Sequence, residues 1–164
     1  MAQFERSLIS GQSPYDQEFH YKIEGSMSDD AIKGKALFES SRTNCSTCHS
    51  GFNFTNYQFE NNGLYEEYED LGRAKLTQTD ADIARFKVPS LRNVAITGPY
   101  MHDGSMNSLE EVINHYNEGG KGHFNQSSKI RPLELSDSEQ EYLLAFLQAL
   151  TDDHFIENEN LTHE

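Results

Sequence analysis

Two cysteines and a histidine stand together in the segment Cys45-Ser46-Thr47-Cys48-His49, and the chain has no other cysteine. The spacing C-x-x-C-H is typical of a c-type haem attachment site, in which both thiols bond to the haem and the histidine ligates its iron. A redox dithiol and half of a zinc site are the alternatives. A dithiol does not need the histidine, and a zinc site needs a second ligand pair at short spacing. The motif therefore predicts one haem c, held by Cys45, Cys48 and His49.

A covalently bound haem also suits the composition of the chain. The 164 residues are enough for one domain, yet hydrophobic residues make up 35% of them and 11 are glycines. A large apolar ring at the centre would complete a core that the side chains alone fill poorly. We therefore expect a single domain with long loops around a buried group.

The chain is acidic, with 27 Asp and Glu against 13 Lys and Arg and a formal net charge of −14. This charge argues against nucleic acid and anionic membrane surfaces as partners. It favours a basic protein partner, although plain solubility explains the charge equally well. No apolar run has the length of a transmembrane helix.

The first residues, Met1-Ala2-Gln3-Phe4-Glu5-Arg6, lack the basic start and apolar stretch of a signal peptide. Haem attachment to this motif normally takes place outside the cytoplasm. We therefore expect the chain to be a mature form or a piece of a longer protein.

Capping residues predict three helices. The first begins after Ser28 and runs to about Ser40, with Gly34 in its interior. An interior glycine costs roughly 1 kcal/mol relative to alanine, which suggests close packing against another helix there. The other two begin with the capping boxes Ser108 to Glu111 and Ser136 to Glu139, and glycines at 119–120 end the first of these.

The remaining segments are expected to be less regular. Residues 1–27 are expected to be a loop-rich lead-in, 50–75 to wrap irregularly over a buried group, and 80–86 to form a short helical turn. We place the haem domain at 28–151 and an acidic tail, frayed or disordered, at 152–164. A helix just before the haem motif and an amphipathic helix near the end predict an all-α, cytochrome c-like single haem domain.

The iron ligand opposite His49 decides the function, because a weakly held position permits peroxide chemistry and a strong ligand makes an electron carrier. Its candidates are Met101, Met106, His102, His115, His123 and Tyr116. By chemistry alone Met101 leads, since a thioether is the usual partner in electron-carrying c-type haems. Core filling is the ordinary alternative for any one methionine.

Several separate blocks carry a family resemblance. They are Phe86-Lys87-Val88-Pro89-Ser90-Leu91-Arg92-Asn93-Val94, Thr97-Gly98-Pro99-Tyr100-Met101-His102-Asp103-Gly104 and Leu109-Glu110-Glu111-Val112-Ile113. In order and spacing they resemble the bacterial dihaem cytochrome c peroxidase family, which includes the methylamine-utilisation enzyme MauG. The resemblance extends over nearly the whole chain, but it covers the C-terminal haem domain of that family alone.

The resemblance implies a set of site residues. Tyr116 falls at the distal ligand position, where the MauG branch has tyrosine, with Met101 as the alternative ligand. His102 would lie in the haem pocket rather than on the iron. Apart from the resemblance, Arg92 and Lys87 are candidates to pair with haem propionates because a buried carboxylate needs a cationic donor, although solvated surface charge explains Lys87 nearly as well. The carbonyls of Thr97 and Pro99 would help to bind a calcium ion between two haem domains, although the partner domain's ligand is absent from this chain.

The resemblance also implies a function. The domain would be the electron-entry or storage half of a periplasmic dihaem oxidoreductase that uses hydrogen peroxide, with little peroxidase activity by itself. Its partners would be the N-terminal haem domain and an electron-donor or substrate protein. The alternatives are a stand-alone monohaem cytochrome c that carries electrons, and an interaction domain that has lost its haem.

Overall fold

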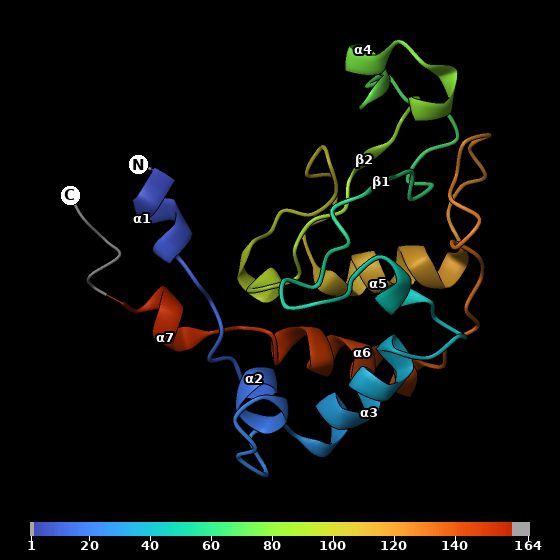
Figure 1. Cartoon of the computed structure of the whole chain (residues 1–164). Helices are drawn as coiled ribbons and strands as arrows, with labels where there is room; N and C mark the ends of the chain where they lie inside the picture. Colours follow the sequence, from blue (N-terminus) through green and yellow to red (C-terminus); the bar gives the residue numbers. More distant parts are fainter. Residues whose placement is uncertain (1, 159–164) are drawn as a thin grey trace.

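The computed structural model describes residues 2–158, and the fold is mainly helical (Figure 1). Its α-helices are α1 (Ala2–Ser7), α2 (Pro14–Phe19), α3 (Asp29–Phe38), α4 (Ala74–Thr77), α5 (Leu109–Glu118), α6 (Asp137–Gln148) and α7 (Asp153–Ile156). Three 3-10 turns are η1 (Cys45–Thr47), η2 (Asp80–Asp82) and η3 (Val94–Ile96). The strands β1 (Phe59–Glu60) and β2 (Phe86–Lys87) pair antiparallel, with Phe59 opposite Lys87.

The three helices predicted from capping residues are confirmed as α3, α5 and α6. The Ser28 side chain caps α3, and complete capping boxes begin α5 at Ser108 and α6 at Ser136. Gly119, with φ of 88°, ends α5 in the left-handed conformation that glycine adopts without strain. These local signals hold because each cap satisfies backbone N–H groups that a helix start leaves free.

Helices α3 and α6 pack directly against each other, and α5 packs on α6 (Figure 1). Gly34 lies in this contact, as its interior position predicts. A Cβ atom on Gly34 would lie 1.8 Å from the Tyr142 carbonyl oxygen and 2.9 Å from the Phe146 Cβ atom. The glycine therefore lets the two helix backbones approach more closely than any side chain would allow.

An aromatic cluster fills the core beneath these helices. The Phe38 and Phe146 rings are 5.0 Å apart, and Tyr15 lies 5.1 Å from Phe54. Tyr15 comes from α2, so part of the expected loop-rich lead-in is a helix that packs on the core. Its start carries a capping box between Ser13 and Asp16.

The two ends of the described chain are tied together by Asp152, which is 1% exposed. Its carboxylate accepts hydrogen bonds from the Ser10 hydroxyl and from the backbone of Gly11 and Gln12, and it also caps α7. The segment that follows residue 151 was expected to be frayed, but it begins with this buried anchor. Helix α7 follows this anchor, and residues 159–164 of the expected acidic tail lie outside the described residues.

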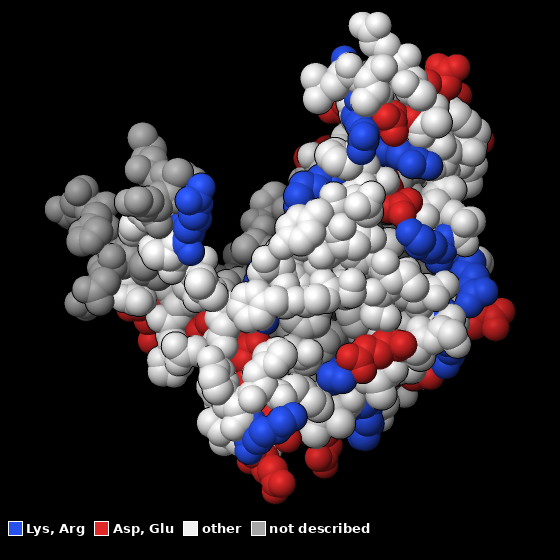
Figure 2. Space-filling model, in the orientation of Figure 1, with Lys and Arg blue, Asp and Glu red and all other residues white. Residues whose placement is uncertain are grey.

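The segment between β1 and β2 projects from the helical body and carries α4 and η2 at its tip (Figure 1). The irregular chain expected at residues 50–75 consists of short turns and of strand β1, which pairs with β2. On the face shown in Figure 2, charged side chains lie mainly toward the edges and the centre carries few of them. Within residues 2–158, none of the helices has the length and apolar character that crossing a membrane requires.

Candidate haem site

A cavity of about 360 Å³ lies between α5, α6 and the loops around the C-x-x-C-H motif. Its volume falls in the range of about 300–1,000 Å³ that ligand pockets have. Most of its wall is apolar, with Val94, Leu109, Ile113, Leu143 and Leu147 among the contributing side chains. The sequence-predicted residues that line it are Cys45, Cys48, His49, Lys87, Met101, His102 and Tyr116.

The haem motif is folded into one helical turn. Asn44, at φ of 58°, takes the left-handed conformation and directs the chain into η1. The backbone N–H groups of Cys48 and His49 both donate to the Cys45 carbonyl, at 3.2 and 2.9 Å. Residues three and four positions apart share one side of such a turn, so both thiols and the imidazole face the cavity together.

The His49 imidazole is oriented by the loop that follows it. Its Nδ1–H donates to the Phe54 carbonyl oxygen at 2.9 Å, which leaves Nε2 as the unprotonated nitrogen of the neutral ring. Burial lowers the pKa of His49 below its ordinary value, although the hydrogen bond to Phe54 opposes this effect. A metal-ligating histidine commonly has a carbonyl partner of this kind on its other nitrogen.

Cys45 and Cys48 do not form a disulfide with each other, and both are partly buried at the cavity wall. Burial raises the pKa of the Cys45 thiol, which also contacts the Thr43 carbonyl at 3.7 Å. The Lys129 ammonium lies 3.9 Å from the Cys48 sulfur and is paired with Glu60. Within the described residues no group of three or more His, Cys, Asp or Glu side chains is arranged to hold a metal ion.

Tyr116 projects from α5 into the same cavity. Burial raises the pKa of its phenol to about 12, while a hydrogen bond from the Asn62 side chain works in the opposite direction. The phenol is therefore protonated at neutral pH in the absence of a cation. A bound metal ion reverses such a preference, because its charge stabilises the phenolate.

Met101, the alternative ligand, also lines the cavity but has a protein partner. The Asn62 side-chain amide donates to its sulfur at 3.2 Å. The backbone of Asn62 is held in turn by His115, whose Nε2 lies 3.0 Å from the Asn62 carbonyl oxygen. Asn62 thus contacts both candidate distal ligands and is fixed to the helix that carries Tyr116.

His102 and Lys87 lie at the cavity wall. The His102 ring stacks on Phe86 with centroids 3.8 Å apart, and the Lys87 ammonium lies 5.4 Å from the centroid of the Tyr57 ring. A pocket role for His102 and a propionate contact for Lys87 stay predictions.

Arg92, Thr97 and Pro99 are not among the cavity-lining residues. The buried Arg92 guanidinium pairs with the Asp16 carboxylate and donates to the Phe52 carbonyl at 2.9 Å. This arrangement gives Arg92 a role in joining α2 to the loop before η3, and its contact with a haem propionate stays a prediction. Thr97 and Pro99 lie exposed in the turn after η3.

Sequence reasoning missed Asn62, Lys129 and Arg131, which also line the cavity. Lys129 and Arg131 add two cations to the one that Lys87 contributes. They lie more than 65 positions from His49 in segments without a recognisable motif, so no local pattern reveals them. The Asn61-Asn62-Gly63 sequence indicates a turn but not which side chain faces a ligand.

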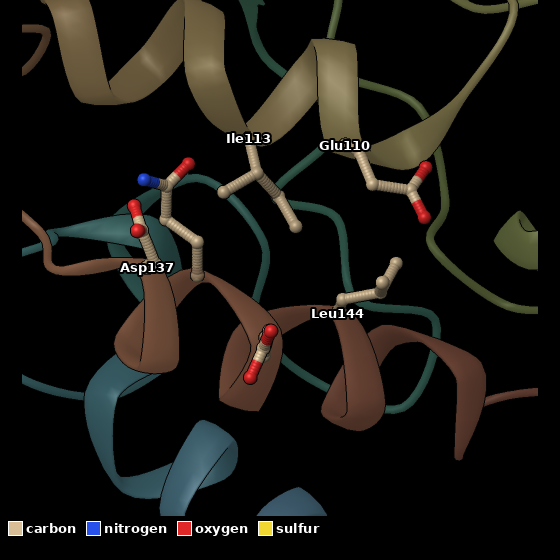
Figure 3. A pocket seen from close by; sticks show the side chains of 6 residues that line it. Glu110, Ile113, Asp137 and Leu144 are labelled. Atoms are coloured by element: carbon tan, nitrogen blue, oxygen red, sulfur yellow. The ribbon is translucent and has the colours of Figure 1, made fainter.

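A second, smaller hollow of about 170 Å³ lies between α5 and α6 (Figure 3). Ile113 and Leu144 form its apolar floor, with Glu110, Asp137 and Glu141 around it. This hollow collects none of the site residues that the haem motif or the family resemblance indicates. The larger cavity is therefore the candidate functional site.

The donor set of this cavity fits a covalently bound haem. It offers two thiols and a neutral imidazole from one turn, a mostly apolar wall, and cations at its margin. A porphyrin needs these contacts for its vinyl groups, iron, ring faces and propionates, respectively. The residues present therefore suit the cofactor that the motif predicts.

The Cytochrome c family model matches residues 31–151. The chain belongs to the cytochrome c family. This assignment confirms the all-α, cytochrome c-like fold and implies a covalent haem c.

Relatives of this cytochrome c domain fall in the family that the sequence resembles. It is 40% identical over 152 residues to the methylamine utilization protein MauG of Methylorubrum extorquens, covering 92% of this chain and 42% of that protein. It is 32% identical over 183 residues to the cytochrome-c peroxidase IdrP1 of Denitromonas iodatirespirans, covering 92% and 48%. The domain is thus homologous to MauG and to the dihaem cytochrome c peroxidases.

Solved structures agree with this assignment. A MauG-like protein associated with microbial copper homeostasis superposes with a TM-score of 0.88 at 30% identity, covering 93% of this chain and 52% of that one. The dihaem peroxidase BthA of Burkholderia thailandensis shares the fold, with a TM-score of 0.71 over 88% of this chain and 47% of its own. The cytochrome c domain spans about half the length of the curated relatives it matches.

Proposed function

We propose that this domain is the electron-transfer half of a dihaem oxidoreductase of the peroxidase and MauG type. In this proposal Cys45 and Cys48 hold one haem c, His49 is its proximal ligand and Tyr116 its distal ligand. One observation carries the proposal: a single cavity collects these four side chains, with the Nε2 atom of His49 left free for iron. When bound, a haem supplies a one-electron couple to the site.

The side chains around the cavity determine which ligands hold the iron and which oxidation state they favour. The hydrogen bond from His49 to Phe54 fixes the ring orientation and increases the basicity of the free nitrogen. The Asn62 amide favours the ionised form of Tyr116 and also engages the sulfur of Met101. These two contacts of Asn62 favour tyrosine over methionine as the distal ligand, because one stabilises the phenolate and the other occupies the thioether sulfur. A phenolate is a hard anionic donor, so it favours the ferric over the ferrous state.

The ligand assignment is tested with the haem-loaded protein and the variant Tyr116→Phe. We expect a changed ferric optical and electron paramagnetic resonance spectrum and a higher reduction potential, because the variant loses an anionic donor. The matched variant Met101→Leu should keep the wild-type spectrum. An unchanged spectrum in Tyr116→Phe, or a changed one in Met101→Leu, would contradict the assignment.

The role of the domain is tested by adding hydrogen peroxide to the ferric protein. An electron-transfer domain should show a low-spin spectrum that peroxide does not alter. A high-spin haem that reacts with peroxide would instead indicate that this half performs the peroxide chemistry itself.

Other features of the proposal concern the complete protein. A second haem domain would be the partner within the same periplasmic protein, since the relatives are about twice as long. Exposed Thr97 and Pro99 would contribute carbonyls to a calcium site between the two domains, which calcium titration of the two-domain protein tests. A stand-alone monohaem carrier is the second candidate, and a single C-x-x-C-H motif in the parent gene would favour it.

A further inference from the structure

The loop that follows α5 is joined to the cavity wall by His123, which is 7% exposed. Its Nδ1 atom lies 3.0 Å from the side-chain nitrogen of Asn61 and 3.0 Å from the backbone nitrogen of Asn125. Asn61 is fully buried and lines the cavity, whereas His123 itself does not. One ring nitrogen therefore connects the wall of the haem site to a loop 62 positions away.

The neighbours of Asn61 fix the direction of its amide group. Its Oδ1 atom accepts the backbone N–H of Gly63 at 2.7 Å and the Tyr68 hydroxyl at 3.2 Å. A backbone N–H can only donate, so the amide oxygen must face Gly63 and the amide NH2 must face His123. The Nδ1 atom of His123 thus accepts two N–H groups and carries no proton. In the neutral ring the proton is on Nε2.

Backbone hydrogen bonds join the same two segments on either side of this contact. The Lys121 N–H donates to the Gly63 carbonyl at 2.8 Å, and the Ser127 N–H donates to the Asn61 carbonyl at 3.0 Å. Asn62 lies between the two acceptors and is the residue that contacts both candidate distal ligands. Its place at the cavity therefore depends on the attachment of this turn to the loop.

The surroundings of His123 do not compensate a positive charge. Among the ion pairs of the described residues, none includes His123. Tyr68 is the titratable side chain that packs on its ring, at 5.1 Å between centroids, and Phe124 lies at 4.4 Å. Lys121 of the same loop pairs with Glu118 of α5. A proton on Nδ1 would point at two N–H donors and leave a buried charge without a partner.

We propose that His123 is a positioning residue for the haem site, which holds Asn61 and Asn62 at the cavity while its ring is neutral and releases them when Nδ1 binds a proton. The proton comes from solvent, and both N–H donors then lose their acceptor. Free imidazole titrates near pH 6.5, so the attachment should loosen as the pH falls through that region. The consequence for the distal ligand rests on the proposed function, whereas the attachment itself does not.

The test is hydrogen exchange of the haem-loaded protein at about pH 7.5 and about pH 5.5, on either side of the titration of free imidazole. Mass spectrometry of peptides measures the exchange, which is corrected for the intrinsic rate at each pH. In the wild type we expect the protection of residues 61–64 and 121–127 to fall about tenfold at the lower pH, while that of α3 changes much less.

His123→Asn supplies an acceptor that does not titrate. An asparagine oxygen accepts the N–H two residues later in the same kind of turn that His123 and Asn125 form. The variant should keep its protection at both pH values. His154→Asn makes the matched change at an exposed histidine of α7 and should behave as the wild type does.

The ferric optical spectrum gives a second readout at the haem. It should differ less between the two pH values in His123→Asn than in the wild type, because Asn62 stays in place in the variant. Equal differences would overturn the positioning role.

Protection that does not respond to pH in the wild type would also overturn the proposal, as would a pH response that His123→Asn retains. So would a loss of protection shared equally by α3, since it would indicate opening of the whole domain. The exchange outcomes do not depend on which residue ligates the iron. They are therefore separate from the outcome of Tyr116→Phe.

Discussion

Asp16 and Arg92 form an ion pair in which the carboxylate is fully buried and the guanidinium side chain is 6% exposed. Burial acts to raise the pKa of Asp16, but hydrogen bonds from Arg92 and Ser13 outweigh it and hold the pKa below the ordinary value. A group with a depressed folded pKa stabilises the fold above its unfolded pKa. That contribution disappears as the pH falls through the folded pKa.

We therefore expect Asp16→Asn to cost about 3–5 kcal/mol at neutral pH, because it leaves the Arg92 charge buried and unpaired. The wild type should lose stability as the pH falls below about 4, and the variant should show a flatter profile there. Urea unfolding at several pH values measures both effects. Asp30→Asn, which breaks an exposed pair with Lys33, should cost under about 1 kcal/mol. Parallel pH profiles for wild type and Asp16→Asn would contradict this account.

At the residue scale the sequence reveals local motifs but not the long-range partners of single side chains. Cys45, Cys48 and His49 form a local motif whose geometry follows from one helical turn. The partner of Arg92 lies 76 positions away in a segment expected to be a loop, so a propionate was the more obvious acceptor for its charge. The contact of Asn62 with both candidate distal ligands depends on the folded chain and leaves no pattern in the sequence.

Among the elements, the α3–α6 contact depends most sharply on one position. In Gly34→Ala the new methyl group would overlap the Tyr142 carbonyl, which is backbone and cannot rotate away. Alanine gains about 1 kcal/mol in helix propensity, but the forced separation of the helices exceeds this gain. We expect a net loss of about 1–3 kcal/mol in the free energy of unfolding, measured by urea denaturation.

Lys33→Ala provides the comparison on the same helix. Lys33 is half exposed, and its removal loses a surface pair with Asp30 and a contact with the Tyr142 ring. Its cost should stay under about 1 kcal/mol. If Gly34→Ala were as stable as Lys33→Ala, close helix contact would not be the reason for the glycine.

Helix starts were predictable wherever a familiar capping box occurs. Ser108 and Ser136 each have a glutamate three residues later, and both helices are present. The missed helix α2 has the same device in a less familiar form, Ser13-Pro14-Tyr15-Asp16, with aspartate completing the box and proline in the first turn. Its six residues are too few to show an amphipathic pattern, so tertiary packing decides whether it forms.

At the scale of the whole molecule, the net charge of −14 should govern encounters with partners. We expect electron exchange between the haem-loaded protein and a basic c-type cytochrome to slow as salt rises. The screening length falls from about 30 Å at 0.01 M to about 8 Å at 0.15 M ionic strength, so the second-order rate should drop on the order of tenfold. Stopped-flow kinetics measures this rate. A neutral redox dye provides the control, and a cytochrome rate as insensitive to salt as the dye's would contradict electrostatic attraction.

The overall fold was predictable because the haem motif, the flanking helices and the family blocks all indicate the same architecture. The contacts that join the two ends of the described chain were not predictable. Its closing contacts join Asp152 to residues 10–12 and Asn93, segments separated by 59 to 142 positions. They involve common polar residues in loops, for which sequence pattern has no signature.

The Asp152 contact has a topological consequence. Because one carboxylate joins the segment at 10–12 to the end of the helical body, the described chain is nearly a closed ring (Figure 1). Every cavity-lining residue, from Phe38 to Leu147, lies within that ring. A circular permutant that links the present ends and opens at the exposed turn around Gly25 would preserve the cavity and its surrounding helices. The cavity therefore depends on the contacts that close this ring and not on the order in which its segments follow one another.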